Sequence, residues 1–245
     1  MQVRVLEAFV VPEPELQALA GELRTRYGRD DLDLSVAAPA RPPEVEAHES
    51  MTALSYAVPE LVRNALEAEA EGIDGLMVDC MADPGIEVLR ETVSIPVLGP
   101  GITSMQVATL LGRRFSLLVT TDFSSRYFHE YARRTRLNAR LASCRQVDIP
   151  PEQLQAESGH TLQALTEAAV QAVESDGADT LILCCTGFAP FSARLGEALD
   201  ARGLSVPLID PFAVTLNALA MLIHSGLSHS GIAFPATAIS AQHRH

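Results

Sequence analysis

Two cysteines, Cys80 and Cys185, each stand at the end of a short apolar run that is typical of a buried strand. In an open parallel sheet, ligands bind beyond the carboxyl ends of the strands, where such side chains would lie. A free thiol has a pKa of about 8.5, which a helix start or nearby backbone N–H groups can lower toward neutrality. Such a thiol can take up or return a proton, so both residues are candidates for acid/base catalysis.

The segments that end in these cysteines form an internal repeat. Gly72–Cys80 lines up with Gly177–Cys185, at an offset of 105 residues from the first position to the last. Each segment follows a long helical pattern and precedes a further helix and then a strand that contains proline. The spacing is too long for a solenoid repeat and indicates a duplicated α/β lobe.

If the two lobes face each other by a pseudo-twofold, the two thiols lie on opposite sides of one cleft. A thiolate on one face of a carbon and a thiol on the other could invert that carbon, with the roles reversed for the other enantiomer. No cofactor is needed if adjacent carbonyls acidify the C–H and if donors stabilise the enolate oxygen. We expect those donors among the backbone N–H groups of 83–85 and 186–188.

Cysteine is also among the residues most often buried as a small apolar side chain, so a single strand-end cysteine would be weak evidence. The equivalent positions of Cys80 and Cys185 in the two repeats favour a function. Cys144 and Cys184 are expected to pack, since side chains alternate along a strand and Cys184 should face away from Cys185. Asp79 should likewise face away from Cys80, although a carboxylate so close would oppose thiolate formation.

The elements that must position these residues alternate along the chain. Short apolar runs predict strands and longer periodic runs predict helices, which together indicate an α/β fold with parallel sheets covered on both faces. The predicted strands are 3–10, 32–36, 76–80, 95–98, 115–121, 141–147, 180–185 and 206–209; the predicted helices are 16–27, 51–71, one from 83, 102–111, 124–135, 151–175, 191–201 and 212–225. We predict a first lobe of residues 1–99 plus 210–227, a second lobe of 100–209, and a flexible tail of 228–245.

The composition fits a folded protein that acts on a small molecule. Of 245 residues, 47% are hydrophobic and 20% are charged, which allows a sizeable core. A formal net charge of −13 excludes a general phosphate-neutralising surface for nucleic acid. With neither a signal peptide nor a membrane span evident, we expect a cytoplasmic protein whose cysteines remain thiols. The spacing of histidines and cysteines predicts no metal site.

The residues around the two cysteines resemble motifs of the aspartate/glutamate/hydantoin racemase superfamily, with most similarity to its hydantoin racemase branch. Cys80-Met81-Ala82-Asp83-Pro84-Gly85 resembles the first cysteine motif of that family, and Cys185-Thr186-Gly187 resembles the second. The segments 94–99, 112–121 and 206–210 resemble strands found there, so that the resemblance extends from about residue 3 to residue 226.

The resemblance implies two similar Rossmann-like lobes with parallel sheets, related by a pseudo-twofold, and an active site in the cleft between them. It implies a cofactor-independent two-base mechanism, with Cys80 and Cys185 as the acid/base pair, and it suggests a homo-oligomer. Thr120 and Thr121 are implied to lie near the ligand. Together with the two cysteine loops they make the predicted substrate-binding set of Asp83, Pro84, Gly85, Thr120, Thr121, Thr186 and Gly187.

The sequence departs from the family's pattern in three places. The stretch Phe9–Pro14 offers none of the polar contacts that usually follow the first strand, Cys184 replaces a glycine, and Asp79 is unusual before the first cysteine. The candidate loops offer no clear cation for a substrate carboxylate, which favours a neutral ring: a 5-substituted hydantoin or a related cyclic ureide such as allantoin. Alternatives are an aspartate or glutamate racemase, a maleate-isomerase-like enzyme, and a two-lobed binding protein without catalysis.

Overall fold

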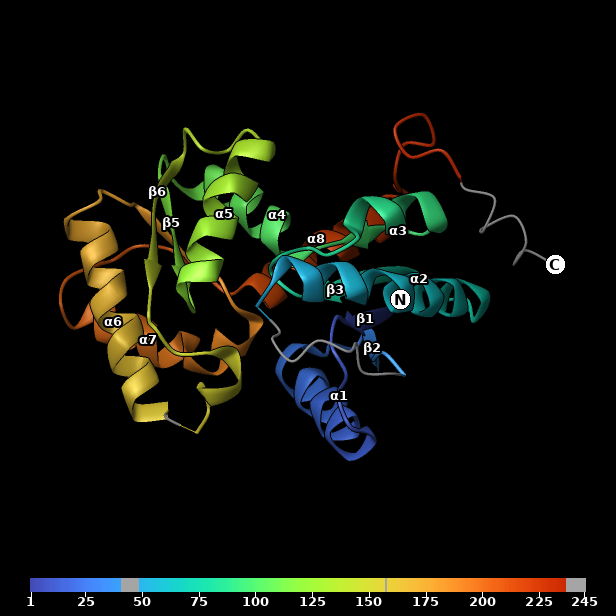
Figure 1. The fold of residues 1–245 in the computed structure, drawn as a ribbon, viewed down its shortest axis with the longest axis horizontal. Helices are drawn as coiled ribbons and strands as arrows, with labels where there is room; N and C mark the ends of the chain where they lie inside the picture. Colours follow the sequence, from blue (N-terminus) through green and yellow to red (C-terminus); the bar gives the residue numbers. More distant parts are fainter. Residues whose placement is uncertain (41–48, 157, 237–245) are drawn as a thin grey trace. The chain divides into compact units, whose positions relative to one another are not determined.

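The computed structural model describes residues 1–40, 49–156 and 158–236. The chain divides into two compact units, one made of Met1–Pro100 with Thr215–His245 and the other of Gly101–Val214. Each unit is built on a four-stranded sheet in which every neighbouring pair of strands is parallel (Figure 1). The predicted α/β fold with two parallel sheets is therefore confirmed.

The first unit has the strand order β2-β1-β3-β4. Its elements are β1 (Gln2–Glu7), α1 (Glu13–Tyr27), β2 (Asp33–Ala37), α2 (Met51–Ala70), β3 (Gly75–Asp79), α3 (Ile86–Thr92), β4 (Val97–Leu98) and most of α8 (Pro211–His224). One face of this sheet, with Leu6, Leu76 and Val78, packs in one apolar cluster with residues of α2 and α3.

The opposite face of the first sheet carries Val3, Val5 and Met77, all fully buried. Helix α8 lies very close to this face at Gly75, where an added Cβ would come within 2.9 Å of Ile223 Cδ1 and 3.1 Å of Leu219 Cδ1. A glycine at the start of β3 therefore allows α8 to pack directly on the strand.

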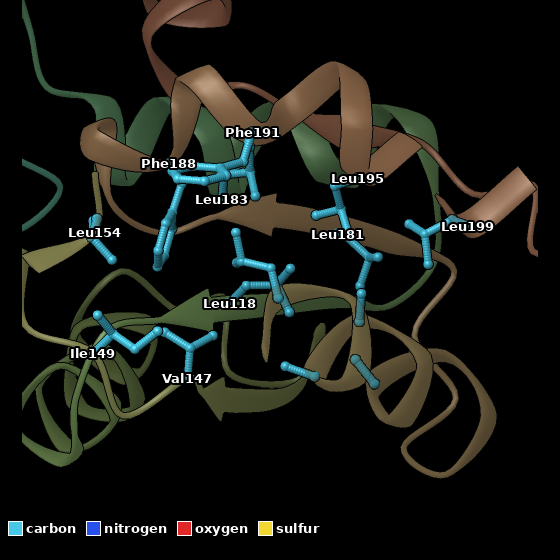
Figure 2. Close-up of a cluster of buried hydrophobic side chains, with 14 of the residues drawn as sticks. Leu118, Val147, Ile149, Leu154, Leu181, Leu183, Phe188, Phe191, Leu195 and Leu199 are labelled. Atoms are coloured by element: carbon cyan, nitrogen blue, oxygen red, sulfur yellow. The ribbon is translucent and has the colours of Figure 1, made fainter. Parts of the chain in front are cut away.

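The second unit has the order β6-β5-β7-β8, which is the same arrangement as in the first. Its elements are α4 (Pro100–Leu111), β5 (Phe115–Val119), α5 (Asp122–Arg134), β6 (Leu141–Gln146), a 3₁₀ turn η1 (Pro151–Gln153), α6 (Ser158–Glu174), β7 (Thr180–Leu183), a 3₁₀ segment η2 (Thr186–Phe191), α7 (Ser192–Asp200) and β8 (Leu208–Ile209). Figure 2 shows its core, in which Leu118, Leu181 and Leu183 of the strands pack with Phe188, Phe191 and Leu195.

The internal repeat extends to individual backbone turns. Gly72 and Gly177 take positive φ angles of 81° and 71° after α2 and α6, a conformation that glycine adopts without steric cost. Asp74 then accepts the Gln2 backbone N–H at 2.7 Å, and Asp179 accepts those of Arg113 and Arg114 at 2.8 and 3.0 Å. In both units, therefore, the aspartate that precedes the third strand (β3 or β7) binds backbone N–H groups at the start of the first strand (β1 or β5).

Two helices begin three or more residues later than predicted. The helix expected from residue 83 begins only at Ile86, because Asp83 and Gly85 have φ angles of 50° and 69° and cannot belong to a right-handed helix. The helix expected over 151–175 is divided, with η1 at its start and α6 from Ser158. Local periodicity identified both helices but not the turns that precede them and move their first residues further along the chain.

The first part of the predicted flexible tail makes defined contacts with the first unit. His229 Nε2 accepts the Val97 backbone N–H at 2.6 Å, and the Arg90 guanidinium lies 5.5 Å from the centre of the Phe234 ring. These contacts place His229 and Phe234 against the first unit, whereas the flexibility of the tail stays a prediction; residues 237–245 lie outside the described residues. Within the described residues, we find no helix with the length and apolar character needed to span a bilayer.

Candidate active site

Cys80 directly follows β3 and is half-buried at the carboxyl end of the first sheet. Its carbonyl accepts the Asp83 backbone N–H at 2.9 Å, which closes a tight turn after the strand. Asp83 is only 6% exposed, and its carboxylate lies against Gly99, where an added Cβ would come within 2.2 Å of Oδ1. The glycine after β4 therefore makes room for the carboxylate that shapes the Cys80 turn.

Cys185 directly follows β7 and is half-buried at the carboxyl end of the second sheet. Its carbonyl accepts the Phe188 backbone N–H at 3.0 Å, which is the turn seen at Cys80. A Cβ added at Gly187 would lie 3.5 Å from the Cys185 sulfur and 3.1 Å from Leu154 Cδ1, so a side chain there would crowd the thiol. The two cysteines thus have the same backbone setting in two sheets of the same topology.

Thr120 and Thr121 follow β5, the strand beside β7. Because Leu118 pairs with Leu183, Thr120 comes level with Cys185 two positions further along. Thr120 Oγ1 lies 3.0 Å from Ser124 Oγ, whereas Thr121 Oγ1 is buried without a hydrogen-bond partner among the described residues. The second unit therefore brings the predicted set of Thr120, Thr121, Cys185, Thr186 and Gly187 to one edge of its sheet.

The first unit gathers Cys80, Asp83, Pro84 and Gly85 in the single turn after β3. The side chains of Asp83 and Pro84 are buried, and Gly85 caps α3 in a left-handed conformation. The predicted start of a helix beside the thiol is absent here, because α3 begins six residues after Cys80. Among the described residues, no group of three or more His, Cys, Asp or Glu is arranged to hold a metal ion.

The other two cysteines, which we expected to pack, are half-buried at Cys144 and buried at Cys184. Cys184 is 3% exposed. Burial raises the pKa of the Cys144 thiol to about 12, so this residue stays protonated at neutral pH. Neither side chain is suited to exchange protons with a substrate.

Asp79 was noted beside Cys80 in the sequence, but its pairing with a second carboxyl group, that of Glu7, was missed. Glu7 ends β1 and pairs in register with Asp79, the last residue of β3. Burial, the negative charge of Asp79 and a hydrogen bond between the two side chains raise the pKa of Glu7 well above its ordinary value. The sequence carried a partial signal, since both residues are acidic at the ends of apolar strands, but it did not show that these strands are neighbours.

Comparison with known protein families identifies the chain. The model of the Asp/Glu/hydantoin racemase family matches residues 15–219, which is most of the sequence. The chain belongs to this family. The family's racemase activity makes the protein an isomerase, and the resemblance stated from its two cysteine motifs is confirmed.

Relatives of known name agree with this assignment. The chain is 27% identical over 171 residues to a hydantoin racemase of Paenarthrobacter aurescens, covering 69% of this chain and 70% of that protein. It is 26% identical over 193 residues to a hydantoin racemase of Rhizobium meliloti, covering 78% of each. Allantoin racemase from Pseudomonas fluorescens superposes with a TM-score of 0.85 at 19% identity, over 97% of each chain, and therefore shares the fold.

Proposed function

We propose that this racemase inverts the acidic ring carbon of a 5-substituted hydantoin or a related cyclic ureide such as allantoin, with Cys80 and Cys185 as the two bases. The observation that supports this most is the equivalent setting of the two thiols. Each follows the third strand of a four-stranded parallel sheet, and each opens a turn closed by a hydrogen bond to its own carbonyl, at 2.9 and 3.0 Å.

In the proposed reaction the two units contribute one thiol each, on opposite faces of the substrate carbon. The thiolate of one cysteine takes the proton, and the electron pair of the broken C–H bond moves into the adjacent carbonyl to give an enolate. The thiol of the other cysteine then delivers its proton to the opposite face, which restores the carbonyl with inverted configuration. The roles of Cys80 and Cys185 exchange for the other enantiomer, so no net proton is consumed.

Backbone donors and hydroxyl groups would hold the ring. The backbone N–H groups of Thr186 and Gly187 belong to the Cys185 turn and are candidates to stabilise the enolate oxygen. Thr120 and Thr121 add hydroxyl groups at the same sheet edge, and Thr121 Oγ1 has no partner among the described residues. Asp83, Pro84 and Gly85 would contribute through the backbone of the Cys80 turn, because the side chains of Asp83 and Pro84 are buried.

Two lines of support favour a neutral cyclic substrate. The curated relatives described above are hydantoin racemases, and the superposed structure is an allantoin racemase. The Cys185 edge offers hydroxyl and backbone donors but no arginine among its predicted contacts, which suits carbonyl and N–H groups better than a carboxylate.

The test is a proton-exchange screen in D2O over hydantoins, allantoin, aspartate and glutamate, starting from single enantiomers. We expect wild-type protein to remove the α-proton signal and the optical rotation of a cyclic ureide but to leave the two amino acids unchanged. Turnover of aspartate or glutamate alone would replace the proposed substrate class. Binding without exchange for every compound would overturn catalysis and favour a binding protein.

Three further properties belong to the same proposal. The mechanism needs no cofactor, so extensive dialysis against a chelator should leave the rate unchanged. The protein acts in the cytoplasm, where its thiols stay reduced. It assembles as a homo-oligomer through exposed apolar residues such as Leu110 and Leu111, which are 83% and 53% exposed on α4. Light scattering of wild-type protein and of Leu110→Ser would test the last point.

A further inference from the structure

The ends of β1 and β3 bring two carboxyl groups side by side within the first unit. Glu7 and Asp79 are register partners in neighbouring parallel strands, which run about 4.8 Å apart. Partners in such a ladder point to the same face of the sheet. Here that face also carries Val5 and Met77, each 0% exposed, so the two acids continue a buried apolar row.

Within the part of the chain that the structure describes, the charge that acts on Glu7 is negative. Oε1 of Glu7 is buried and has no hydrogen-bond partner among the described residues, and Asp79 is the one charged group that acts on it there. Arg4 of β1 points to the opposite face, where it pairs with Glu71 and Ser35. Two carboxylates in this position cannot both be ionised without strong repulsion.

The other charged residues of α1, β2 and α8 from Thr215 onward are exposed. In α8, from Thr215 onward, the titratable residue is His224, in the last turn. His224 directly follows Ile223, which packs with Leu219 on Gly75 at the start of β3, four positions before Asp79. In β2 the titratable residue is Asp33, which pairs with Gln2 at the other end of β1. Helix α1 carries the half-buried Tyr27 and five exposed charged residues, of which Arg24 binds the Leu34 carbonyl: Glu13, Glu15, Glu22, Arg24 and Arg26. After β3 come Cys80 and Asp83.

We propose that Glu7 and Asp79 hold one proton between them, with Glu7 as the acid that donates to the Asp79 carboxylate, and that this keeps the charge beside Cys80 at −1. Glu7 then acts as a positioning residue, because it sets the electrostatic surroundings of a base that it does not need to contact. The inference rests on the proposed function for its meaning in catalysis, but the shared proton itself can be tested without a substrate.

The shared proton makes stability depend on pH in a definite direction. In the unfolded chain Glu7 loses its proton near its ordinary pKa of 4.5, whereas in the folded protein it keeps the proton to higher pH. The stabilisation is therefore fully present below pH 4.5 and is lost as pH rises through the raised pKa of the folded protein. Glu7→Gln mimics the protonated acid and cannot titrate, so it should remove this loss.

The first experiment compares urea unfolding midpoints of wild-type protein and Glu7→Gln from pH 4 to pH 9. We expect the two curves to coincide at the acid end and to separate upward from pH 4.5, with the variant unfolding at higher urea at alkaline pH. Glu87→Gln, an exposed change on α3, serves as the matched control and should follow the wild type. Parallel curves for wild type and Glu7→Gln would show that Glu7 titrates normally and would overturn the proposal.

The second experiment reads the charge beside Cys80 through the pH dependence of its alkylation by iodoacetamide, with Cys185 of the same molecules as the internal reference. Asp79→Asn, made in the Glu7→Gln background so that neither side chain can ionise, removes the negative charge and should speed Cys80 alkylation at neutral pH by about tenfold, one pKa unit. Glu7→Gln should match the wild type at neutral pH, since the pair carries −1 in both. A rate for Cys80 that does not respond to Asp79→Asn in that background overturns the link to the thiol.

A third measurement uses wild-type protein alone, so it remains decisive if a variant fails to fold. The infrared spectrum at pH 7 should contain the carbonyl band of a protonated carboxyl group, and its absence would overturn the shared proton. These results are independent of turnover. If the stability curves diverge but no substrate exchanges its proton, the acid pair stands and the proposed racemisation of a cyclic ureide does not. If a substrate exchanges its proton but the stability curves are parallel, the proposed racemisation stands and the acid pair does not.

Discussion

The two units have the same strand order and the same turns, yet they differ where their central strands end. In the first unit the last pair of the β1–β3 ladder is Glu7 and Asp79. At the corresponding place in the second unit, one position beyond Leu118 and Leu183, stand Val119 and Cys184, which are 0% and 3% exposed. One sheet thus ends in two acids and the other in two packed side chains.

One residue further along, the distribution of polar groups is reversed. The position level with Cys80 is Ala8, which is 1% exposed and is followed by Phe9, whereas Cys185 has Thr120 and Thr121 beside it. A duplicated backbone can therefore give two equivalent thiols unlike surroundings. Cys80 lies next to an acid pair and Cys185 next to hydroxyl groups, so we expect the two thiols to differ in the pH dependence of their reactivity.

The strongest test of this comparison removes one thiol at a time. Cys80→Ser and Cys185→Ser should each lower racemisation by about 10² to 10⁴-fold, the usual contribution of a positioned acid or base. Exchange in D2O should survive for a different enantiomer in each variant, because each retains one base. Cys144→Ser is the control and should racemise within about twofold of wild type. Wild-type racemisation in both active-site variants would disprove the two-thiol mechanism.

Within the second unit, the reactivity of the Cys144 thiol can be compared directly with that of free cysteine. With a pKa of about 12, Cys144 is about one part in 10⁴ thiolate at pH 8, whereas an ordinary thiol of pKa 8.5 is about one quarter ionised. Cys144 should therefore react with iodoacetamide about 10³-fold more slowly than free cysteine, and peptide mass spectrometry would follow this. Rapid labelling of Cys144 in the native protein would contradict its packing role.

The aspartates that anchor the two sheets should differ in strength. Asp179 accepts two backbone N–H groups and Asp74 accepts one, so Asp179→Ala should cost about 2 to 3 kcal/mol in unfolding free energy and Asp74→Ala about 1 to 2. Although burial opposes it, hydrogen bonding to Arg113 and Arg114 holds the pKa of Asp179 below its ordinary value. The contribution of Asp179 is thus present above pH 4 and lost as pH falls through the folded pKa. Equal losses in urea denaturation would contradict this ranking.

The smallest expected effect concerns the described residues that follow α8, which belong to the first unit. Burial and the nearby Arg90 lower the pKa of His229 to about 4, so the imidazole is neutral and accepts the Val97 N–H. Since the unfolded histidine binds its proton near pH 6.5, stability is lost as pH falls from 6.5 to 4. His229→Ala should cost about 1 kcal/mol at pH 7 and less at pH 4. Thermal melts of wild type and His229→Ala at both pH values would contradict this role if the loss of stability were the same at each.

Much of the fold followed from local patterns in the sequence. Apolar runs and helical periodicity located the strands and helices, and the repeat from Gly72 to Cys80 and from Gly177 to Cys185 indicated two similar α/β halves. The same repeat singled out the two strand-end cysteines. These features are local or recur at a fixed offset, so a single sequence is enough to reveal them.

What the sequence did not reveal depends on contacts between distant segments. The left-handed turn at Asp83 is supported by room for its carboxylate against Gly99, and His229 meets a strand 132 residues earlier in the chain. The pairing of Glu7 with Asp79 needs the register of β1 and β3, which no periodicity specifies. Side-chain chemistry that arises from strand pairing is therefore the part that sequence patterns leave open.

The close packing of α8 on Gly75 has a consequence for how the protein is made. The second unit is one continuous stretch, Gly101–Val214, whereas the first unit needs the chain from Thr215 onward. During synthesis, the start of β3 at Gly75 stays uncovered on the face that α8 covers until Leu219 and Ile223 leave the ribosome. The half that begins the chain is accordingly the last to be completed, and nascent protein must keep that apolar surface from aggregating in the meantime.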